Sequence, residues 1–148
     1  MFQSSKLLRA AVATLGLAVV AGCAANSSGT APELAGAWYQ VYFDSNGSDI
    51  DSRGRMIVDT VAYVATNNGA TRVTVIGKTD RVGGAGANLA LSKRRADAVR
   101  DALITAGVPA THIDTSWSGE ARQEVATAND TAEQRNRVVD ITVVKQSR

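Results

Sequence analysis

The chain has 148 residues, 45% of them apolar, and a formal net charge of +2. This length accommodates one ordinary domain with an appendage around a single core, which excludes a two-domain organisation. Two of the 16 Lys and Arg residues, Lys6 and Arg9, lie in an N-terminal segment that we expect to be removed, which leaves 14 basic against 14 acidic residues. A neutral mature chain lacks the basic field that dominates nucleic-acid affinity, so nucleic acid is excluded as a partner.

The first 22 residues have the layout of an export signal. Lys6 and Arg9 precede residues 10–20 (AAVATLGLAVV), an apolar run shorter than the roughly 20 residues of a membrane-spanning helix. The run leads into Val20-Ala21-Gly22-Cys23, which resembles the bacterial lipobox, and Cys23 is the only cysteine of the chain. We therefore expect cleavage before Cys23 and acylation of its thiol. The alternative is an ordinary secretory signal with an incidental cysteine.

Residues 23–36 are expected to form the lipidated cysteine and a flexible tether, because they are small and polar, contain Gly and Pro, and have no apolar period. Thirteen residues, 24–36, reach at most about 45 Å when extended. Ala24 stands where inner-membrane lipoproteins of enteric bacteria carry an aspartate. The resemblance to lipoproteins therefore implies an anchor in the outer membrane, with the folded domain in the periplasm.

The folded domain is expected over residues 37–148, beginning with a strand, a helix and a second strand. Residues 38–43 (WYQVYF) are rich in aromatic and β-branched side chains and precede the turn-forming DSNG. A helix capped by Asp51 or Ser52 is predicted to end at residues 67–69 (NNG). Residues 72–77 (RVTVIG) then form a second strand, parallel to the first. The apolar stripe of the helix is Ile57, Val58, Val61, Val64 and Ala65.

The second half of the domain is predicted to add one helix and two strands. The helix begins at Asn88 or a neighbour and ends at Gly107, with Pro109 just beyond. Strands follow at 112–118 and 138–144, separated by a polar connection over 119–137. The order βαβαββ predicts an α+β two-layer sandwich, with two helices on one face of a four-stranded mixed sheet and the other face partly solvated.

Two opposite charges stand on either side of the glycine-rich stretch after the second strand. Asp80 follows the strand, and Arg95 lies near the start of the second helix, in line with Asn88 and Ser92 at helical spacing. If the loop and helix fold back on the strand end, an aspartate and a guanidinium face one cavity. This pairing predicts recognition of a ligand that carries both an ammonium and a carboxylate.

The same stretch resembles a known family. Thr79-Asp80, then Asn88-x-x-Leu91-Ser92-x-x-Arg95-Ala96, then Arg135-Asn136-Arg137 are similar to the OmpA-like C-terminal domain, which includes the peptidoglycan-associated lipoproteins. The resemblance covers residues 38–146. It implies a non-enzymatic protein that binds peptidoglycan non-covalently through the diaminopimelate of the stem peptide and ties the membrane to the wall, without a cofactor or metal.

The resemblance also implies a role for each matched residue. Asp80 would pair with the ligand ammonium and Arg95 with its carboxylate, while Asn88 and Arg137 occupy further pocket positions. Asp44 belongs to the segment that closes the first strand. The planar fork of arginine can hold a carboxylate through two bonds, which lysine cannot reproduce.

Structural alternatives exist for these residues. Asp80 could only accept backbone bonds in a turn, Asn88 could be only a helix cap, and Arg95 could belong to a solvated helix face with Arg94 and Arg100. Trp38 and Trp117 are expected to serve packing rather than to form sugar-binding platforms, and His112 is expected to be structural within the third strand.

Other functions also remain open. An envelope assembly or partner-protein adaptor could use this fold without wall binding. A hydrolase with Asp80 and Glu120 as paired carboxylates would need a defined separation between the two.

Three departures from the family pattern bear on the site. Lys78 stands where the family commonly has histidine, and would weaken an ammonium site if its side chain pointed inward. Asn136-Arg137-Val138 has one arginine fewer than the usual N-R-R-V, and the proline often found after the segment around Glu120 is missing.

Overall fold

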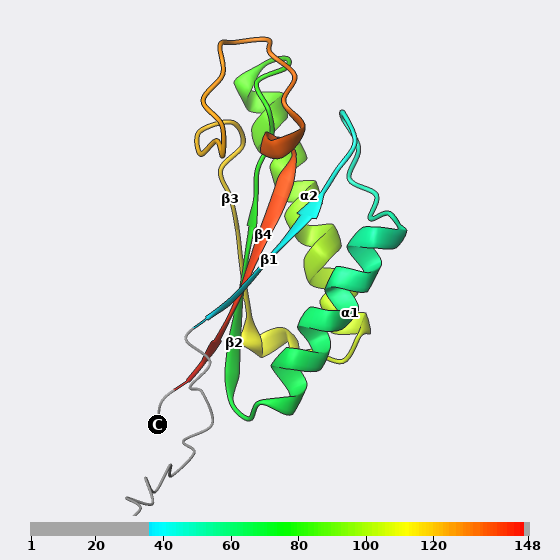
Figure 1. The fold of residues 1–148 in the computed structure, drawn as a ribbon. Helices are drawn as coiled ribbons and strands as arrows, with labels where there is room; N and C mark the ends of the chain where they lie inside the picture. The colour runs from blue at the N-terminus through cyan, green and yellow to red at the C-terminus, as the bar shows by residue number, and fades with distance from the viewer. Residues whose placement is uncertain (1–35, 147–148) are drawn as a thin grey trace, which may run out of the picture. The chain divides into compact units, whose positions relative to one another are not determined.

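The computed structural model describes residues 36–146 of the chain. The predicted signal segment of residues 1–22, Cys23 and nearly all of the tether lie outside the described residues, so these expectations are untested. The described part forms a single layer of sheet with two helices packed on one face (Figure 1). The helices, strands and core residues all lie within residues 36–146. We therefore expect residues 24–148 to fold without the signal segment.

The sheet has four strands in the order β1-β4-β2-β3. They are β1 (Ala37–Tyr42), β2 (Thr71–Gly77), β3 (Ile113–Trp117) and β4 (Val138–Lys145). β4 lies between β1 and β2 and is antiparallel to both, whereas β2 and β3 are parallel. The predicted α+β mixed sheet is thus confirmed, and the last strand of the chain brings residue 138 beside the ends of β1 and β2.

Helices α1 (Ser52–Asn67) and α2 (Ala85–Thr105) cover one face of the sheet. α1 starts where the sequence predicts, because the Asp51 carboxylate accepts a hydrogen bond from the Gly54 N–H at 2.6 Å. The core lies between the helices and the strand residues that alternate toward them. Its most buried members include Val41, Phe43, Val61, Val75, Val99, Leu103, Val139 and Ile141.

α2 begins three residues before the predicted Asn88. Its N-cap is Gly84, in an extended conformation, and the Asn88 N–H donates to the Gly84 carbonyl within the first turn. Glycine and alanine between residues 83 and 87 suggested a loop, but they adopt the helix once α2 packs on the sheet. The alternative that Asn88 is only a helix cap is therefore wrong.

One further expectation is corrected at the third strand. His112 lies in the short 3-10 turn η1 (Ala110–His112), just before β3, and not in the strand. Trp38 and Trp117 are 58% and 40% exposed, so neither is a buried core residue. Trp38 lies on the sheet face away from the helices, and Lys93 stands 5.0 Å over the Trp117 ring at the sheet edge.

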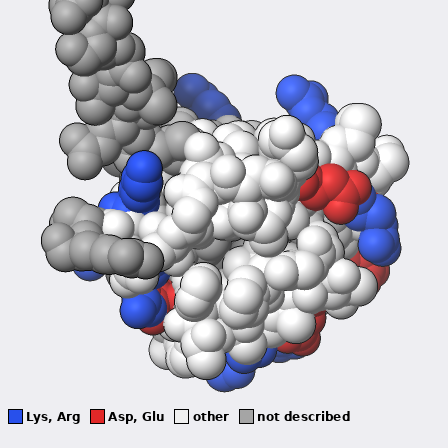
Figure 2. Space-filling view, turned by 90° about the horizontal axis from the view of Figure 1, so that it is seen from below, with Lys and Arg blue, Asp and Glu red and all other residues white. Residues whose placement is uncertain are grey.

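The two ends of the sheet differ in charge. β1 enters at Ala37 and runs toward the end where β2 finishes and β4 begins (Figure 1). Figure 2 views the opposite end, where uncharged residues cover most of the surface and charged side chains lie mainly around its margin. The charged residues singled out in the sequence lie at the far end of β1 and β2.

Candidate functional site

Asp80 is positioned by the close contact between the end of β2 and α2. At Gly77, a Cβ atom would lie 2.0 Å from the Ser92 carbonyl oxygen, so only glycine fits there. The chain then turns, and the Thr79 N–H donates to the Gly119 carbonyl at 2.9 Å. Asp80 follows and is only 6% exposed. The glycine at the end of the strand thus allows the carboxylate to lie beside the start of α2.

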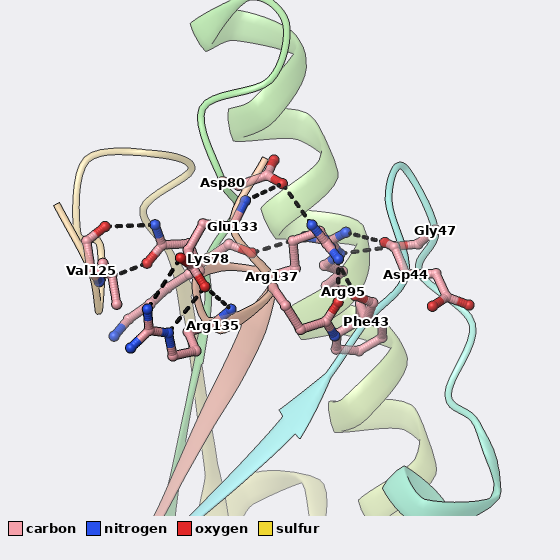
Figure 3. Close-up of polar contacts among 12 residues, drawn as sticks. Phe43, Asp44, Gly47, Lys78, Asp80, Arg95, Val125, Glu133, Arg135 and Arg137 are labelled. Carbon is pink, nitrogen blue, oxygen red and sulfur yellow. Dashed lines mark hydrogen bonds and ion pairs between the residues drawn. The ribbon is translucent and has the colours of Figure 1, made fainter. Parts of the chain in front are cut away.

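The Asp80 carboxylate is paired with Arg137. Its Oδ2 accepts from Arg137 Nη1 at 3.0 Å and from the Glu133 N–H at 3.4 Å (Figure 3). Arg137 also donates through Nε to the Phe43 carbonyl at 3.2 Å and through Nη2 to Gln134. Oδ1 of Asp80 accepts no hydrogen bond from the described residues. The structure therefore brings together two of the predicted site residues, and leaves one carboxylate oxygen without a partner.

Arg95 is completely buried, although arginine is rarely found fully inside a protein. Its Nε donates to the Gly47 carbonyl at 2.8 Å, Nη1 to the Lys78 carbonyl at 3.1 Å and Nη2 to the Asp44 carbonyl at 2.7 Å. The alternative that Arg95 belongs to a solvated helix face is therefore wrong, whereas its neighbour Arg94 is exposed. Three of the five N–H groups of the guanidinium hold the backbone around the site.

Burial and neighbouring charges shift the pKa of Arg95. Burial lowers the pKa to about 10, the Asp80 charge partly opposes this effect, and the Arg137 charge adds to it. The guanidinium nevertheless stays charged at neutral pH. One aspartate and two arginines thus lie close together at this end of the sheet.

Asp44 takes part through its backbone. Its carbonyl accepts from Arg95, while its side chain is exposed. Residue 44 thus lies just after the first strand, as predicted. Its hydrogen bond with Arg95, however, is made by the backbone carbonyl, which any residue at this position would supply.

Asn88 is buried in the first turn of α2 and binds a residue that the sequence did not connect to it. Its Nδ2 donates to Glu120 Oε2 at 2.7 Å, and Glu120 Oε1 lies 3.8 Å from Arg81 Nε. The Asp80 and Glu120 carboxylates therefore have different partners, Arg137 and Asn88 respectively. The signal that could have identified Arg81 and Glu120 is their position next to Asp80 and Gly119, the residues that flank the strand ends.

Lys78 does not contact Asp80. Its ammonium lies 2.6 Å from Asp140 Oδ2 and also pairs with Glu124. Burial lowers the pKa of Lys78, but the hydrogen bonds to Asp140 and Glu124 and the charges of these two carboxylates together raise it more, so the net shift is upward. Strand alternation places the Lys78 side chain on the sheet face away from the helices, so it does not point inward toward Asp80.

A separate hollow lies between α1 and α2 and has a volume of about 350 Å³. None of the predicted site residues lines it; its walls are Arg55, Val58, Asp59, Ala102, Thr105 and Ala106. We place the candidate site at the charged strand ends, because charge and hydrogen-bonding capacity gather there. Over residues 36–146, no helix is long and apolar enough to cross a membrane, and no cluster of three metal-ligating side chains occurs.

Comparisons with known proteins agree with the fold. The model of the OmpA family matches residues 42–138. A relative in Escherichia coli (strain K12), "Probable lipoprotein YiaD", is 39% identical over 103 residues, which cover 70% of this chain and 47% of the relative. "Peptidoglycan-associated lipoprotein" of Pasteurella multocida is 36% identical over 97 residues, which cover 66% of this chain and 65% of the relative.

Solved structures show the same fold. The peptidoglycan-associated lipoprotein of Burkholderia pseudomallei superposes with a TM-score of 0.65 at 25% identity, over 70% of this chain and 88% of that one. The C-terminal domain of Helicobacter pylori MotB superposes with a TM-score of 0.63 at 21% identity, over 74% of this chain and 86% of that one. The second similarity supports the fold alone.

Proposed function

Because the chain belongs to the OmpA family, we propose that it is a non-enzymatic envelope protein that binds peptidoglycan and ties an outer membrane to the cell wall. Two similar proteins carry lipoprotein names, and one of these names states an association with peptidoglycan. The ligand we propose is the diaminopimelate of the stem peptide, which presents an ammonium and a carboxylate on one carbon.

The observation that carries this proposal is the state of the Asp80 carboxylate. Oδ2 is held by Arg137 and by the Glu133 N–H, while Oδ1 has no partner among the described residues. A ligand ammonium bound at Oδ1 would form a charge-assisted bond without displacing Arg137. Such bonds contribute roughly 1.5–3 kcal/mol.

The ligand carboxylate is assigned to the two arginines. Arg95 has three N–H groups on the backbone carbonyls of Gly47, Lys78 and Asp44, which leaves one N–H on each Nη nitrogen. Because Arg95 is completely buried, the ligand can reach these N–H groups only if the segment around Asp44 moves. Arg137, whose side chain is 12% exposed, is the more accessible cation at the mouth of the site.

Asn88 is proposed as a polar wall of the same pocket. Its amide is held by Glu120 at 2.7 Å and is 4% exposed, so its orientation is fixed before a ligand arrives. Asp80 and the two arginines supply groups of both charges, as recognition of a zwitterionic end requires.

The anchor is the second part of the proposal. We propose cleavage after residue 22, acylation of Cys23, a tether over residues 23–36 and an OmpA-like domain over residues 37–148. β1 begins at Ala37 and runs about 20 Å to the end that carries Asp80. The end of the sheet viewed in Figure 2, where charged side chains lie mainly around the margin, would then face the membrane, and the binding site would point toward the wall.

Sedimentation with purified peptidoglycan sacculi tests wall binding. Residues 24–148 are expected to sediment with sacculi, Asp80→Ala and Arg95→Ala are expected to remain in the supernatant, and the exposed neighbour Arg94→Ala is expected to behave like the wild type. Asp80→Ala is the decisive variant, because Arg95→Ala also removes buried hydrogen bonds. Wild-type protein that fails to sediment, or Asp80→Ala that sediments equally well, would contradict wall binding and favour an adaptor that uses the fold without it.

Metabolic labelling with a fatty-acid analogue tests the anchor separately. The full chain should acquire label, and Cys23→Ser should not. Label retained by Cys23→Ser would exclude the proposed lipidation, whatever the result with sacculi.

A further inference from the structure

Lys78 is close in sequence to the proposed binding residue Asp80, but its side chain lies on the sheet face away from the helices. Its ammonium is 11% exposed and pairs with two carboxylates, Asp140 in the central strand β4 and Glu124 in the long segment between β3 and β4. We call residues 118–137 the β3–β4 connection. The ion pair with Asp140 stays within the sheet, whereas the pair with Glu124 joins the end of β2 to this connection.

Contacts within the β3–β4 connection link Glu124, the partner of Lys78, to the site around Asp80. Glu124 is followed by Val125, whose N–H donates to the Asn136 side chain at 2.9 Å and whose carbonyl accepts from it at 2.7 Å. Asn136 is completely buried, and its neighbour Arg137 donates to Asp80 at 3.0 Å. These contacts therefore link Lys78, through Glu124, Val125, Asn136 and Arg137, to Asp80, which lies two residues after Lys78 in the chain. Figure 3 labels Val125, Arg137 and Asp80 of this path.

A second cation supports the same connection. Arg81 Nη1 donates to the Thr127 carbonyl at 3.1 Å, and the Asp130 N–H donates to the Arg81 carbonyl at 2.8 Å. Lys78 and Arg81 thus flank Thr79-Asp80 and each holds a different part of the connection. The segment that supplies Arg137 and the Glu133 N–H to Asp80 is consequently anchored from both sides.

We propose that Lys78 is a positioning residue for the peptidoglycan site, which holds Glu124 and, through the Val125–Asn136 bridge, places Arg137 on Asp80. The proposal rests on the proposed function for the identity of the ligand. Without the Lys78–Glu124 pair, the connection loses an attachment, Arg137 samples positions away from Asp80, and the charge pattern that the ligand meets is no longer fixed.

The test uses Glu124→Gln, which keeps the shape of a side chain that is 30% exposed. Asp114→Asn is the matched control, because it breaks the exposed Arg72–Asp114 pair on the same sheet, away from the connection. Two quantities are measured in residues 24–148: the amide exchange rate of Val125 by NMR, which needs no ligand, and the affinity for a soluble diaminopimelate stem peptide by calorimetry.

We expect Glu124→Gln to speed amide exchange at Val125 and to weaken peptide binding. Each effect should be about tenfold, which corresponds to the loss of one charge-assisted bond. The melting temperature of Glu124→Gln should fall by a few degrees, because the lost bond also stabilises the folded state, whereas Asp114→Asn should alter neither exchange nor affinity. A purely structural ion pair would lower the melting temperature and leave the affinity of the folded protein unchanged. Exchange and affinity that stay at wild-type values in Glu124→Gln would overturn the proposal.

A double-variant comparison provides a second criterion. Lys78→Met should weaken binding as Glu124→Gln does, and the variant with both changes should bind no more weakly than Lys78→Met alone, because both remove one attachment. Additive losses would overturn the proposal. If wild-type protein binds no peptide at all, the proposed function fails, and the exchange rate of Val125 still decides the role of Lys78.

Discussion

Replacing Arg95 by lysine tests how much of the domain depends on one buried guanidinium. Lysine keeps the positive charge and a long side chain, but it is a point charge and cannot reproduce the fork that reaches three acceptors. The acceptors are the carbonyls of Gly47, Lys78 and Asp44, at 2.8, 3.1 and 2.7 Å. They lie on two different segments, so one ammonium cannot serve all three.

We expect Arg95→Lys to lose two of the three hydrogen bonds. A hydrogen bond to a charged group contributes about 1.5 kcal/mol at the low end, so the free energy of unfolding should fall by about 3 kcal/mol. For a domain of this size, that loss lowers the melting temperature by about 12 °C. Arg94→Lys, which changes an exposed neighbour on the same helix, should shift it by less than about 2 °C.

Thermal unfolding followed by circular dichroism measures both variants against the wild type. The buried network around Arg95 would be refuted if Arg95→Lys and Arg94→Lys melted at the same temperature. Such a result would mean that the carbonyls of residues 44 and 47 find water or other donors, and that the segment after β1 is not held by α2.

Two further predictions concern packing and pH. Gly77→Ala should destabilise the domain by more than about 3 kcal/mol in urea unfolding, because its Cβ would lie 2.0 Å from the Ser92 carbonyl oxygen. The control Gly86→Ala, whose Cβ would have no atom within 4 Å, should stabilise α2 by up to about 1 kcal/mol. Equal effects of the two changes would contradict the close contact between β2 and α2. Because folding raises the pKa of Lys78, its ion pairs contribute fully to stability below the ordinary lysine pKa, and this contribution is lost as the pH rises through the pKa of the folded state. The difference in unfolding free energy between the wild type and Lys78→Met should therefore shrink above pH about 10.5. A difference that stayed constant up to pH 12 would show that the Lys78 ion pairs contribute nothing.

The elements of the fold were predictable because their signals are local. Alternation in residues 138–144 and the helical stripe from Ile57 to Ala65 each follow from one segment of the chain. The start of α2 was misplaced because glycine and alanine near residue 85 have no local sign of a helix, and the sheet supplies the contacts that stabilise it there. The exposure of Trp38 could not be read from the sequence, because it depends on which sheet face the helices cover.

The site was predictable as a set of residues but not as a set of contacts. The distance along the sequence between Asp80 and Arg95 indicated one site, yet the direct partner of Asp80 is Arg137, 57 positions away. That pairing exists because β4 enters the sheet between β1 and β2, a topology that no local pattern specifies. For the same reason, the partners of Lys78, which are Asp140 and Glu124, could not be foreseen.

The most direct test of the central claim compares two stem peptides that differ at one residue. One carries diaminopimelate and the other carries lysine, which has the side-chain ammonium but lacks the carboxylate beside it. Calorimetry with residues 24–148 should show the diaminopimelate peptide binding more tightly by about tenfold or more, the contribution of one charge-assisted bond to the arginines. Equal affinity for the two peptides, or binding of neither, would contradict recognition of a zwitterionic end by Asp80, Arg95 and Arg137.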